Sequence, residues 1–271
     1  PVNQNGEVDP QDVADAIRKD TVLVAIMHAN NEIGTIQPIK KIGEICKGNN
    51  ILFFVDACQT FGKLEINVKD MKIDLLAATA HKLYGPKGIG FLYVCQKDPK
   101  VILEMQMDGG GHERGFRSGT LPVPLIVGFS KATEICIQKK ESEYHSLGKF
   151  RDLLLNGIKR EHADIILNGN TENGLSHNLN LCFPNLEAET IIMKLKGIAC
   201  SAGSACSSNS LEPSHVIKAL GYNNEMAHSA IRFSVGRFTT QIEIEKAIFE
   251  INSAVSFLKS KRKERVRQTF Y

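Results

Sequence analysis

The sequence has no long hydrophobic run and no strong charge of either sign. No apolar stretch in its 271 residues is long enough to cross a membrane, and the first ten, PVNQNGEVDP, contain no signal-peptide core. The formal net charge of +3 is too small to argue for nucleic-acid binding. The composition, 42% hydrophobic and 23% charged, is that of an ordinary globular protein, and we expect neither membrane nor direct nucleic-acid partners.

Paired cysteines are also lacking. The seven cysteines are scattered without any Cys-x-x-Cys pair, which argues against a disulfide framework and favours a reducing compartment. Five lie in apolar or periodic runs and are expected to be small buried side chains: Cys46, Cys58, Cys95, Cys136 and Cys182. Cys206 differs because it lies in a small-residue stretch that cannot pack a core, so we expect an exposed, mobile loop there. Its thiol is either functional or an incidental surface cysteine.

The apolar runs predict an α/β sheet. Residues 21–28 and 73–78 are predicted to be buried strands, of which the first is expected to be parallel, and further strands are predicted at 51–55 and 89–94. Helical spacing covers residues 10–19 and 38–47. Strands that alternate with helices in this way are typical of a mostly parallel sheet.

The second half of the chain has a different pattern. A long charged helix is predicted from about 125 to 160, and a domain change is placed within it. Short strands and helices follow, with strands at 165–167, 178–183 and 229–235 and helices at 187–196, 211–220 and 242–263. We therefore predict a large domain over residues 1–138 and a smaller α+β domain over residues 139–271, which carries the Cys206 loop.

Polar side chains follow three successive predicted strands. Asn31 follows the first strand, Asp56 and Gln59 the second, and Thr79, His81 and Lys82 the third. Parallel strands bring their carboxyl ends to one edge of a sheet, where ligand sites of α/β proteins form. A lysine at such an edge is either a surface lysine at a loop tip or an amine that forms a Schiff base. A lone aspartate after a strand is more often a helix N-cap, but three polar strand ends together favour a site.

A glycine-rich segment lies between the two predicted domains. Residues 109–115 form a polar loop that ends in Arg117-Ser118-Gly119-Thr120. Glycine-rich loops can hold phosphate with backbone N–H groups, but this one lacks the spacing of the phosphate-binding fingerprints. A mobile surface loop is the alternative.

Six segments together resemble a known family. They are HANNEIG (28–34), VDACQ (55–59), TAHKLYGPKGIG (79–90), GGGHERGFRSGTLP (109–122), SAGSACSSNSLEPS (201–214) and IRFSVGRFTT (231–240). In this order they resemble the group I cysteine desulfurases of the IscS/NifS type, within the class V aminotransferases. The resemblance implies the aspartate-aminotransferase-like fold type I of pyridoxal-phosphate enzymes. It also implies removal of sulfur from L-cysteine, which gives L-alanine and an enzyme persulfide.

The resemblance assigns roles to the polar strand ends of the first half. Lys82 would hold pyridoxal phosphate covalently and later move the substrate's α-proton. Asp56 would pair with the pyridinium nitrogen, and Gln59 would hydrogen-bond the ring hydroxyl. Thr79 and His81 would bind the phosphate, with His81 also in the catalytic group.

Further roles fall on the remaining matched segments. Thr120 would reach the phosphate of the neighbouring subunit, which implies a homodimer. Arg232 would clamp the substrate carboxylate, helped by Asn31, which also belongs to the cofactor site. Cys206 would attack the substrate sulfur and become the persulfide, and it could ligate a transferred iron–sulfur cluster. No resident metal is expected.

The resemblance also implies partners and a location. The sulfur would pass to an iron–sulfur scaffold or other acceptor proteins, for cluster assembly and tRNA thiolation, in bacterial cytoplasm or a mitochondrion-like organelle. The family's first segment, with a phosphate-binding Gly-Ala-Thr loop and a ring-stacking histidine, is not matched, and there is no initiator Met, so we expect a chain that lacks its N-terminal segment. A non-catalytic fragment that only binds partners and a selenocysteine lyase are the alternatives.

Overall fold

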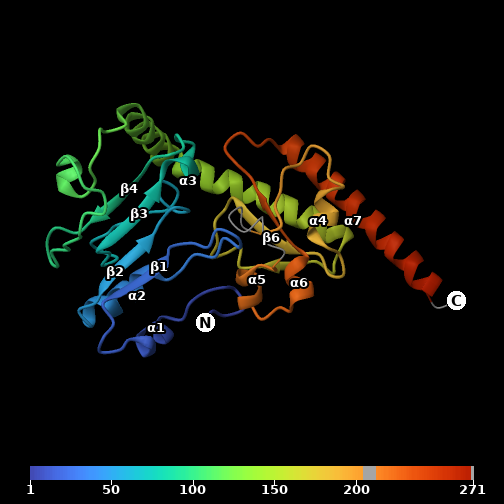
Figure 1. Cartoon of the computed structure of the whole chain (residues 1–271). Helices are drawn as coiled ribbons and strands as arrows, with labels where there is room; N and C mark the ends of the chain where they lie inside the picture. Colours follow the sequence, from blue (N-terminus) through green and yellow to red (C-terminus); the bar gives the residue numbers. More distant parts are fainter. Residues whose placement is uncertain (204–211, 270–271) are drawn as a thin grey trace. The chain divides into compact units, whose positions relative to one another are not determined.

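The computed structural model describes residues 1–203 and 212–269, and the chain in it forms two compact units (Figure 1). Unit 2 contains residues 10–28 and 37–140, and unit 1 contains residues 1–9, 29–36 and 141–271. The short segment 29–36 therefore clusters with the C-terminal half of the chain. The division at residues 138 and 139 stays a prediction.

Unit 2 is built on a four-stranded mixed sheet. The strand order is β1-β2-β3-β4, in which β1 pairs with β2 and β2 with β3 in parallel, while β4 is antiparallel to β3. The predicted α/β class with a mostly parallel sheet is confirmed. The bounds are β1 (Leu23–Met27), β2 (Leu52–Asp56), β3 (Leu75–Thr79) and β4 (Gly90–Val94), with helices α1 (Pro10–Ala16) and α2 (Ile39–Gly48).

One face of this sheet carries the core of unit 2. Alternate strand residues and the apolar side of α2 pack together there, including Phe53, Val55, Leu76, Ile39 and Ile42. The prediction that residues 21–28 form a buried strand is wrong for β1, because none of its residues is fully buried and those on the opposite face are exposed. Leu23 and Met27 of β1 are 42% and 43% exposed, because β1 is an edge strand whose alternate side chains point away from the core.

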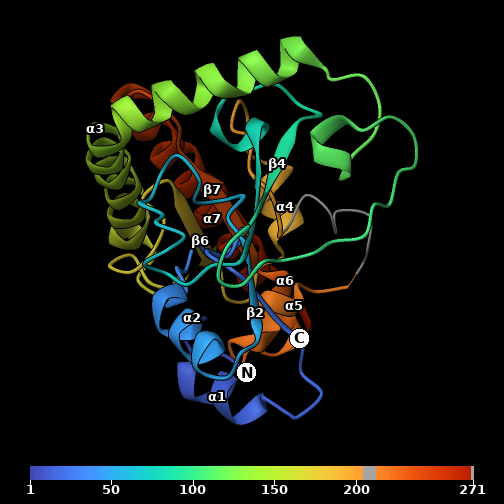
Figure 2. The same cartoon turned by 90° about the vertical axis from the view of Figure 1, so that its left-hand side faces the viewer.

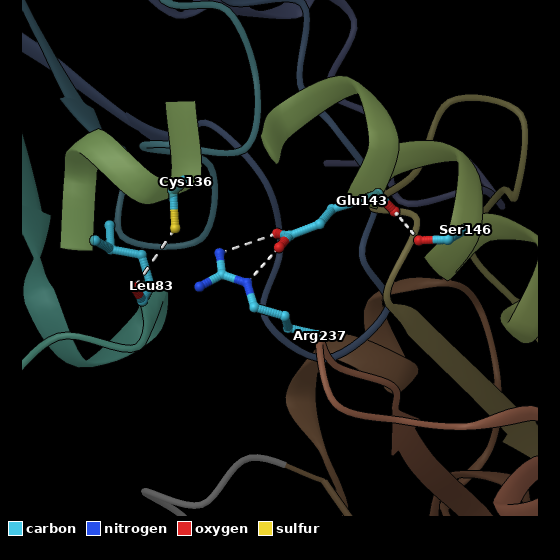
Figure 3. A network of polar contacts seen from close by, with 5 residues as sticks. All are labelled: Leu83, Cys136, Glu143, Ser146 and Arg237. Atoms are coloured by element: carbon cyan, nitrogen blue, oxygen red, sulfur yellow. Dashed lines mark hydrogen bonds and ion pairs between the residues drawn. The ribbon is translucent and has the colours of Figure 1, made fainter. Parts of the chain in front are cut away.

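A short turn and a long helix complete unit 2. The 3₁₀ helices η1 (Ala80–Leu83) and η2 (His112–Gly115) precede α3 (Val123–Glu161), which continues into unit 1. Ala80 and Leu83 pack against Phe129 and Cys136 of α3. The Cys136 thiol also donates to the carbonyl oxygen of Leu83 at 3.5 Å (Figure 3). The turn that follows β3 is therefore fixed from its buried side.

Unit 1 is built on an antiparallel sheet. Its strands are β5 (Ile166–Asn168), β6 (Asn178–Cys182) and β7 (Ala230–Ser234), in that order, and β6 is buried at every position. The helices that follow α3 are α4 (Ala188–Ile192), α5 (His215–Ala219), α6 (Asn224–His228) and α7 (Gln241–Thr269) (Figure 2). Leu181, Ile191, Ile231 and Ile251 are fully buried in the core that these elements share.

One predicted helix of unit 1 is shorter in the structure, and one helix was not predicted. The helix predicted over residues 187–196 is regular only as α4, which ends at Ile192 where a turn begins. Helix α6 was not predicted; it begins where Asn223 caps the backbone N–H of Met226. Over residues 1–203 and 212–269, every helix is either too short or too polar to cross a bilayer.

A half-buried ion pair ties α3 to the loop after β7 within unit 1. The guanidinium of Arg237 faces the carboxylate of Glu143 with two nitrogens, and one of the two contacts measures 3.2 Å (Figure 3). The side chains are only 12% and 19% exposed. A two-pronged contact of this kind fixes the loop more firmly than a surface pair.

Candidate active site

The carboxyl ends of β2 and β3 place Asp56 and Thr79 on one edge and one face of the sheet. Asp56 is the last residue of β2 and is in register with Ala77 of β3, two residues before Thr79. Side chains two residues apart in a strand point to the same face. Because β2 and β3 are parallel neighbours, the predicted meeting of these strand ends is confirmed for Asp56 and Thr79.

Thr79, His81 and Lys82 form a compact turn after β3. The hydroxyl of Thr79 and Nδ1 of His81 share a hydrogen bond of 2.8 Å, while the side chains of His81 and Lys82 are exposed. The turn closes with the backbone N–H of Gly85 on the carbonyl oxygen of Ala80 at 3.0 Å. A Cβ at Gly85 would lie 2.9 Å from that oxygen, so only glycine permits this closure. The turn thus presents an amine, an imidazole and a hydroxyl to solvent.

Cys58 is hydrogen-bonded to Asp56, and its thiol is within electrostatic reach of Lys82. The backbone N–H of Cys58 donates to Oδ1 of Asp56 at 2.9 Å. Burial raises the pKa of the Cys58 thiol to about 12, the hydrogen bond and the negative charge of Asp56 add to the rise, and the positive charge of Lys82 opposes it. Asp56 and Lys82 are therefore both close enough to act on one thiol. Gln59 follows and is half-buried.

A buried histidine lies behind the same edge. His28 follows β1, and its backbone N–H donates to the carbonyl oxygen of Asp56 at 2.8 Å. Its ring is 4% exposed, and among the residues that the structure describes Nδ1 finds no hydrogen-bond partner. Burial lowers the pKa of His28 to about 4. The imidazole is therefore neutral at physiological pH.

The glycine-rich segment is held closed by a buried serine. The hydroxyl of Ser118 contacts the carbonyl oxygens of Met107 and Asp108, at 2.6 and 2.8 Å. Glu113 and Arg114 adopt positive φ angles of 51° and 58° at the tip. Thr120, two residues past the serine, is exposed. The segment is a tied loop with an exposed tip, and whether it binds phosphate stays a prediction.

Arg232 and Asn31 meet within unit 1. Nη1 of Arg232 donates to the backbone oxygen of Asn31 at 2.8 Å. Arg232 also exchanges backbone hydrogen bonds with Ser201, at 2.8 and 3.2 Å, so the first residue of the SAGSAC segment forms an isolated bridge to the middle of β7. The sequence placed these two residues in one site, and they are in contact. Cys206 lies outside the described residues.

Four residues have environments that the sequence did not indicate. Cys58 and Cys95 were expected to be buried but are only half-buried, and Cys58 lies beside Asp56 because the chain turns immediately after β2. His28 and Glu32 were treated as the end of a strand and part of the break after it. Their position inside the matched HANNEIG segment was the signal available.

The family described as "Aminotransferase class-V" matches residues 1–247. The chain belongs to this family. It is 53% identical over 255 residues to "Cysteine desulfurase IscS" of Histophilus somni, which covers 94% of this chain and 63% of that protein. It is 52% identical over 256 residues to the protein of the same name from Vibrio cholerae, again with 94% and 63% coverage.

Solved structures of this family have the same fold. A "NIFS-LIKE PROTEIN" superposes with a TM-score of 0.85 at 34% identity and covers 95% of this chain and 67% of its own. A NifS-like protein from Rickettsia africae gives 0.84 at 27% identity, with 94% and 68% coverage. The resemblance inferred from six short segments is confirmed. The chain spans about 63% of the length of the curated relatives it matches.

Proposed function

We propose that this chain carries the catalytic residues of a pyridoxal-phosphate-dependent cysteine desulfurase. Pyridoxal phosphate requires an amine for its aldehyde, an acid for its ring nitrogen and hydrogen-bonding groups for its phosphate. The edge of the unit 2 sheet supplies these as Lys82, Asp56 and the Thr79–His81 pair. The donor set therefore fits the cofactor, which when bound supplies an electron sink for bonds at the substrate's α-carbon.

Each residue at this edge has one task in the proposal. The amine of Lys82 anchors the cofactor and then moves the proton at the substrate α-carbon. The carboxylate of Asp56, oriented by the backbone of Cys58, keeps the ring nitrogen protonated. Gln59 hydrogen-bonds the ring hydroxyl, and the Thr79–His81 pair binds the phosphate.

Substrate recognition and sulfur transfer fall to residues of unit 1. The guanidinium of Arg232, held by the backbone oxygen of Asn31, binds the carboxylate of L-cysteine. The Cys206 thiol takes the substrate sulfur, so that L-cysteine and a thiol become L-alanine and a persulfide. The same proposal includes a homodimer, in which Thr120 reaches the second subunit. It also includes the sulfur-acceptor proteins and a cytoplasmic or organellar location. They rest on the resemblance of the matched segments.

The clustering of Lys82, Asp56, Thr79 and His81 on one sheet edge is the observation that carries this proposal. The test supplies purified protein, in its natural length, with pyridoxal phosphate and L-cysteine under a reductant, and measures L-alanine and sulfide. We expect equal amounts of both products, and no turnover for Cys206→Ser although cofactor uptake is retained. Cofactor uptake without turnover by the wild-type protein would contradict a desulfurase. Turnover of selenocysteine but not cysteine would instead identify a selenocysteine lyase.

A further inference from the structure

The segment 29–36 is a tight turn built around Asn30. The side-chain oxygen of Asn30 accepts from the backbone N–H groups of Glu32 and Ile33, at 2.8 and 3.0 Å. Its backbone N–H donates to the carbonyl oxygen of Thr35 at 3.0 Å, and Ala29 bridges to Ile36. The local hydrogen bonds of the turn therefore hold the backbone of Glu32, in addition to its contacts with distant residues.

The main chain of Glu32 is also fastened to the unit 1 sheet. Its carbonyl oxygen accepts from the side-chain amides of Asn178 and Asn180, both on β6, at 3.3 and 3.2 Å. Asn180 receives a further hydrogen bond from the amide of Asn168 on β5, at 2.7 Å. A chain of amides on a fully buried strand thus holds the turn in place.

The carboxylate of Glu32 points into the protein, which is unusual for this residue type. The residue is 2% exposed, and its Oε2 accepts from the hydroxyl of Ser214 at 2.7 Å. Ser214 in turn caps helix α5 by accepting from the backbone N–H of Ile217 at 3.3 Å. A Cβ built on Gly203 would lie 3.8 Å from the same Oε2. One carboxylate oxygen therefore lies next to residues on both sides of the 204–211 segment.

The same turn holds the arginine assigned to the substrate. Asn31, adjacent to Glu32, accepts from Nη1 of Arg232 at 2.8 Å. The backbone of Arg232 pairs with that of Ser201, whose hydroxyl donates to the carbonyl oxygen of Gly203 at 2.9 Å. Arg232 is therefore linked through Ser201 to Gly203, and Asn31 is linked through its neighbour Glu32 to Ser214. Glu32 also lies near Gly203, so both sets of contacts converge on Glu32.

We propose that Glu32 is a positioning residue: its buried carboxylate binds Ser214 and lies beside Gly203, and so helps to hold these residues, which flank the Cys206 segment, relative to Arg232. This inference rests on the proposed function, since it concerns the binding of the substrate carboxylate and the placing of the thiol. Glu32 itself does not touch the reacting atoms.

The test compares Glu32→Ala with Glu32→Gln in the pyridoxal-phosphate-loaded protein. Glu32→Ala removes the acceptor of Ser214, so we expect KM for L-cysteine to rise about tenfold, the equivalent of about 1.4 kcal/mol. We also expect iodoacetamide to alkylate Cys206 at least about threefold faster, measured on the Cys206 peptide by mass spectrometry. Glu32→Gln keeps an acceptor oxygen and should restore most of both properties. Ser214→Ala should mimic Glu32→Ala, and the double variant should add little.

A matched control separates positioning from stability. Asp74 is another buried acid, whose carboxylate accepts from the backbone N–H of Phe53 at 2.9 Å in unit 2. Asp74→Asn should lower the melting temperature but leave KM and the alkylation rate of Cys206 unchanged. If Glu32→Ala also leaves KM and the alkylation rate within twofold of wild type, or slows alkylation, Glu32 is merely structural and the inference is wrong. If the wild-type protein has no turnover, the proposed function fails, and alkylation alone decides the role of Glu32.

Discussion

The edge of the unit 2 sheet and the turn at residues 29–36 of unit 1 differ in the exposure of their charged side chains and in the contacts that hold them. At the sheet edge, His81, Lys82 and Asp56 are exposed and are held mainly through the backbone of the strands and of η1. In the turn, Glu32 is buried and is held by side chains of β6 and by Ser214. In the proposed function, the groups that bind the cofactor are accessible, whereas Glu32, proposed to position its neighbours, is buried and hydrogen-bonded. Variants of the two regions should therefore fail in different ways.

The sharpest test of the comparison is Lys82→Ala. Because an exposed lysine on a fixed turn carries little packing energy, the variant should fold normally but lose cofactor-dependent turnover by more than about 10²-fold. Borohydride reduction should attach the cofactor to the Lys82 peptide in wild-type protein only, as mass spectrometry can show. Lys87, an exposed lysine five residues further on, is the matched control, and Lys87→Ala should keep full activity. Equal losses in both variants would count against Lys82.

Acid should unfold the protein through His28 rather than through the exposed residues of the edge. The pKa of His28 is lowered to about 4, so between pH 6.5 and 4 the unfolded chain binds a proton that the folded chain does not. Stability is then complete above pH 6.5 and falls by about 1.4 kcal/mol per pH unit below it. Urea unfolding between pH 7.5 and 4.5 measures this slope. His28→Gln should flatten it, whereas replacement of the exposed His145 should not.

The Glu143–Arg237 ion pair lies outside the candidate site, so its loss should change the free energy of unfolding without a direct effect on activity. Glu143→Gln leaves the guanidinium of Arg237 without its anion, which we expect to cost about 2 kcal/mol of unfolding free energy. Chemical denaturation measures the loss, and Lys131→Met, which breaks an exposed pair with Glu134, should cost less than about 0.5 kcal/mol. Equal costs would show that enclosure of the pair does not matter.

The smallest effect is expected at Thr79. Thr79→Ala removes the hydroxyl that contacts His81, and the affinity for pyridoxal phosphate should fall about tenfold, as expected for one lost hydrogen bond. Thr79→Ser keeps the hydroxyl and should bind the cofactor as wild type does. Absorbance titration of the cofactor-free protein measures both affinities. If Thr79→Ala binds the cofactor as tightly as wild type, the Thr79 hydroxyl does not contribute to cofactor binding.

Much of unit 2 could be predicted from the sequence because its signals are local. Apolar runs predicted strands β1 to β4, and the polar residues at the strand ends, Asp56, Thr79 and Lys82, predicted the candidate site. The continuous run of β1 indicated burial on both faces, but exposure depends on what covers a face, which no local pattern contains. The sequence likewise did not predict that β4 would be antiparallel to β3, since pairing direction depends on the connection between the strands.

The arrangement around Glu32 could not be predicted for a similar reason. Its carboxylate meets Ser214, 182 residues away in the sequence, and its carbonyl meets Asn178 and Asn180. Glutamate is ordinarily a surface residue, so composition and periodicity place it outside. Only the matched segments brought Asn31 and Arg232 into one site, and none of them indicated that the acid next to Asn31 is buried.

The environment of Cys58 keeps its thiol protonated and therefore unreactive. With a pKa of about 12, roughly one in 10⁴ of these side chains is ionised at pH 8, and thiolates rather than thiols are the nucleophiles. We therefore expect the Cys58 thiol to take no part in the proposed sulfur transfer.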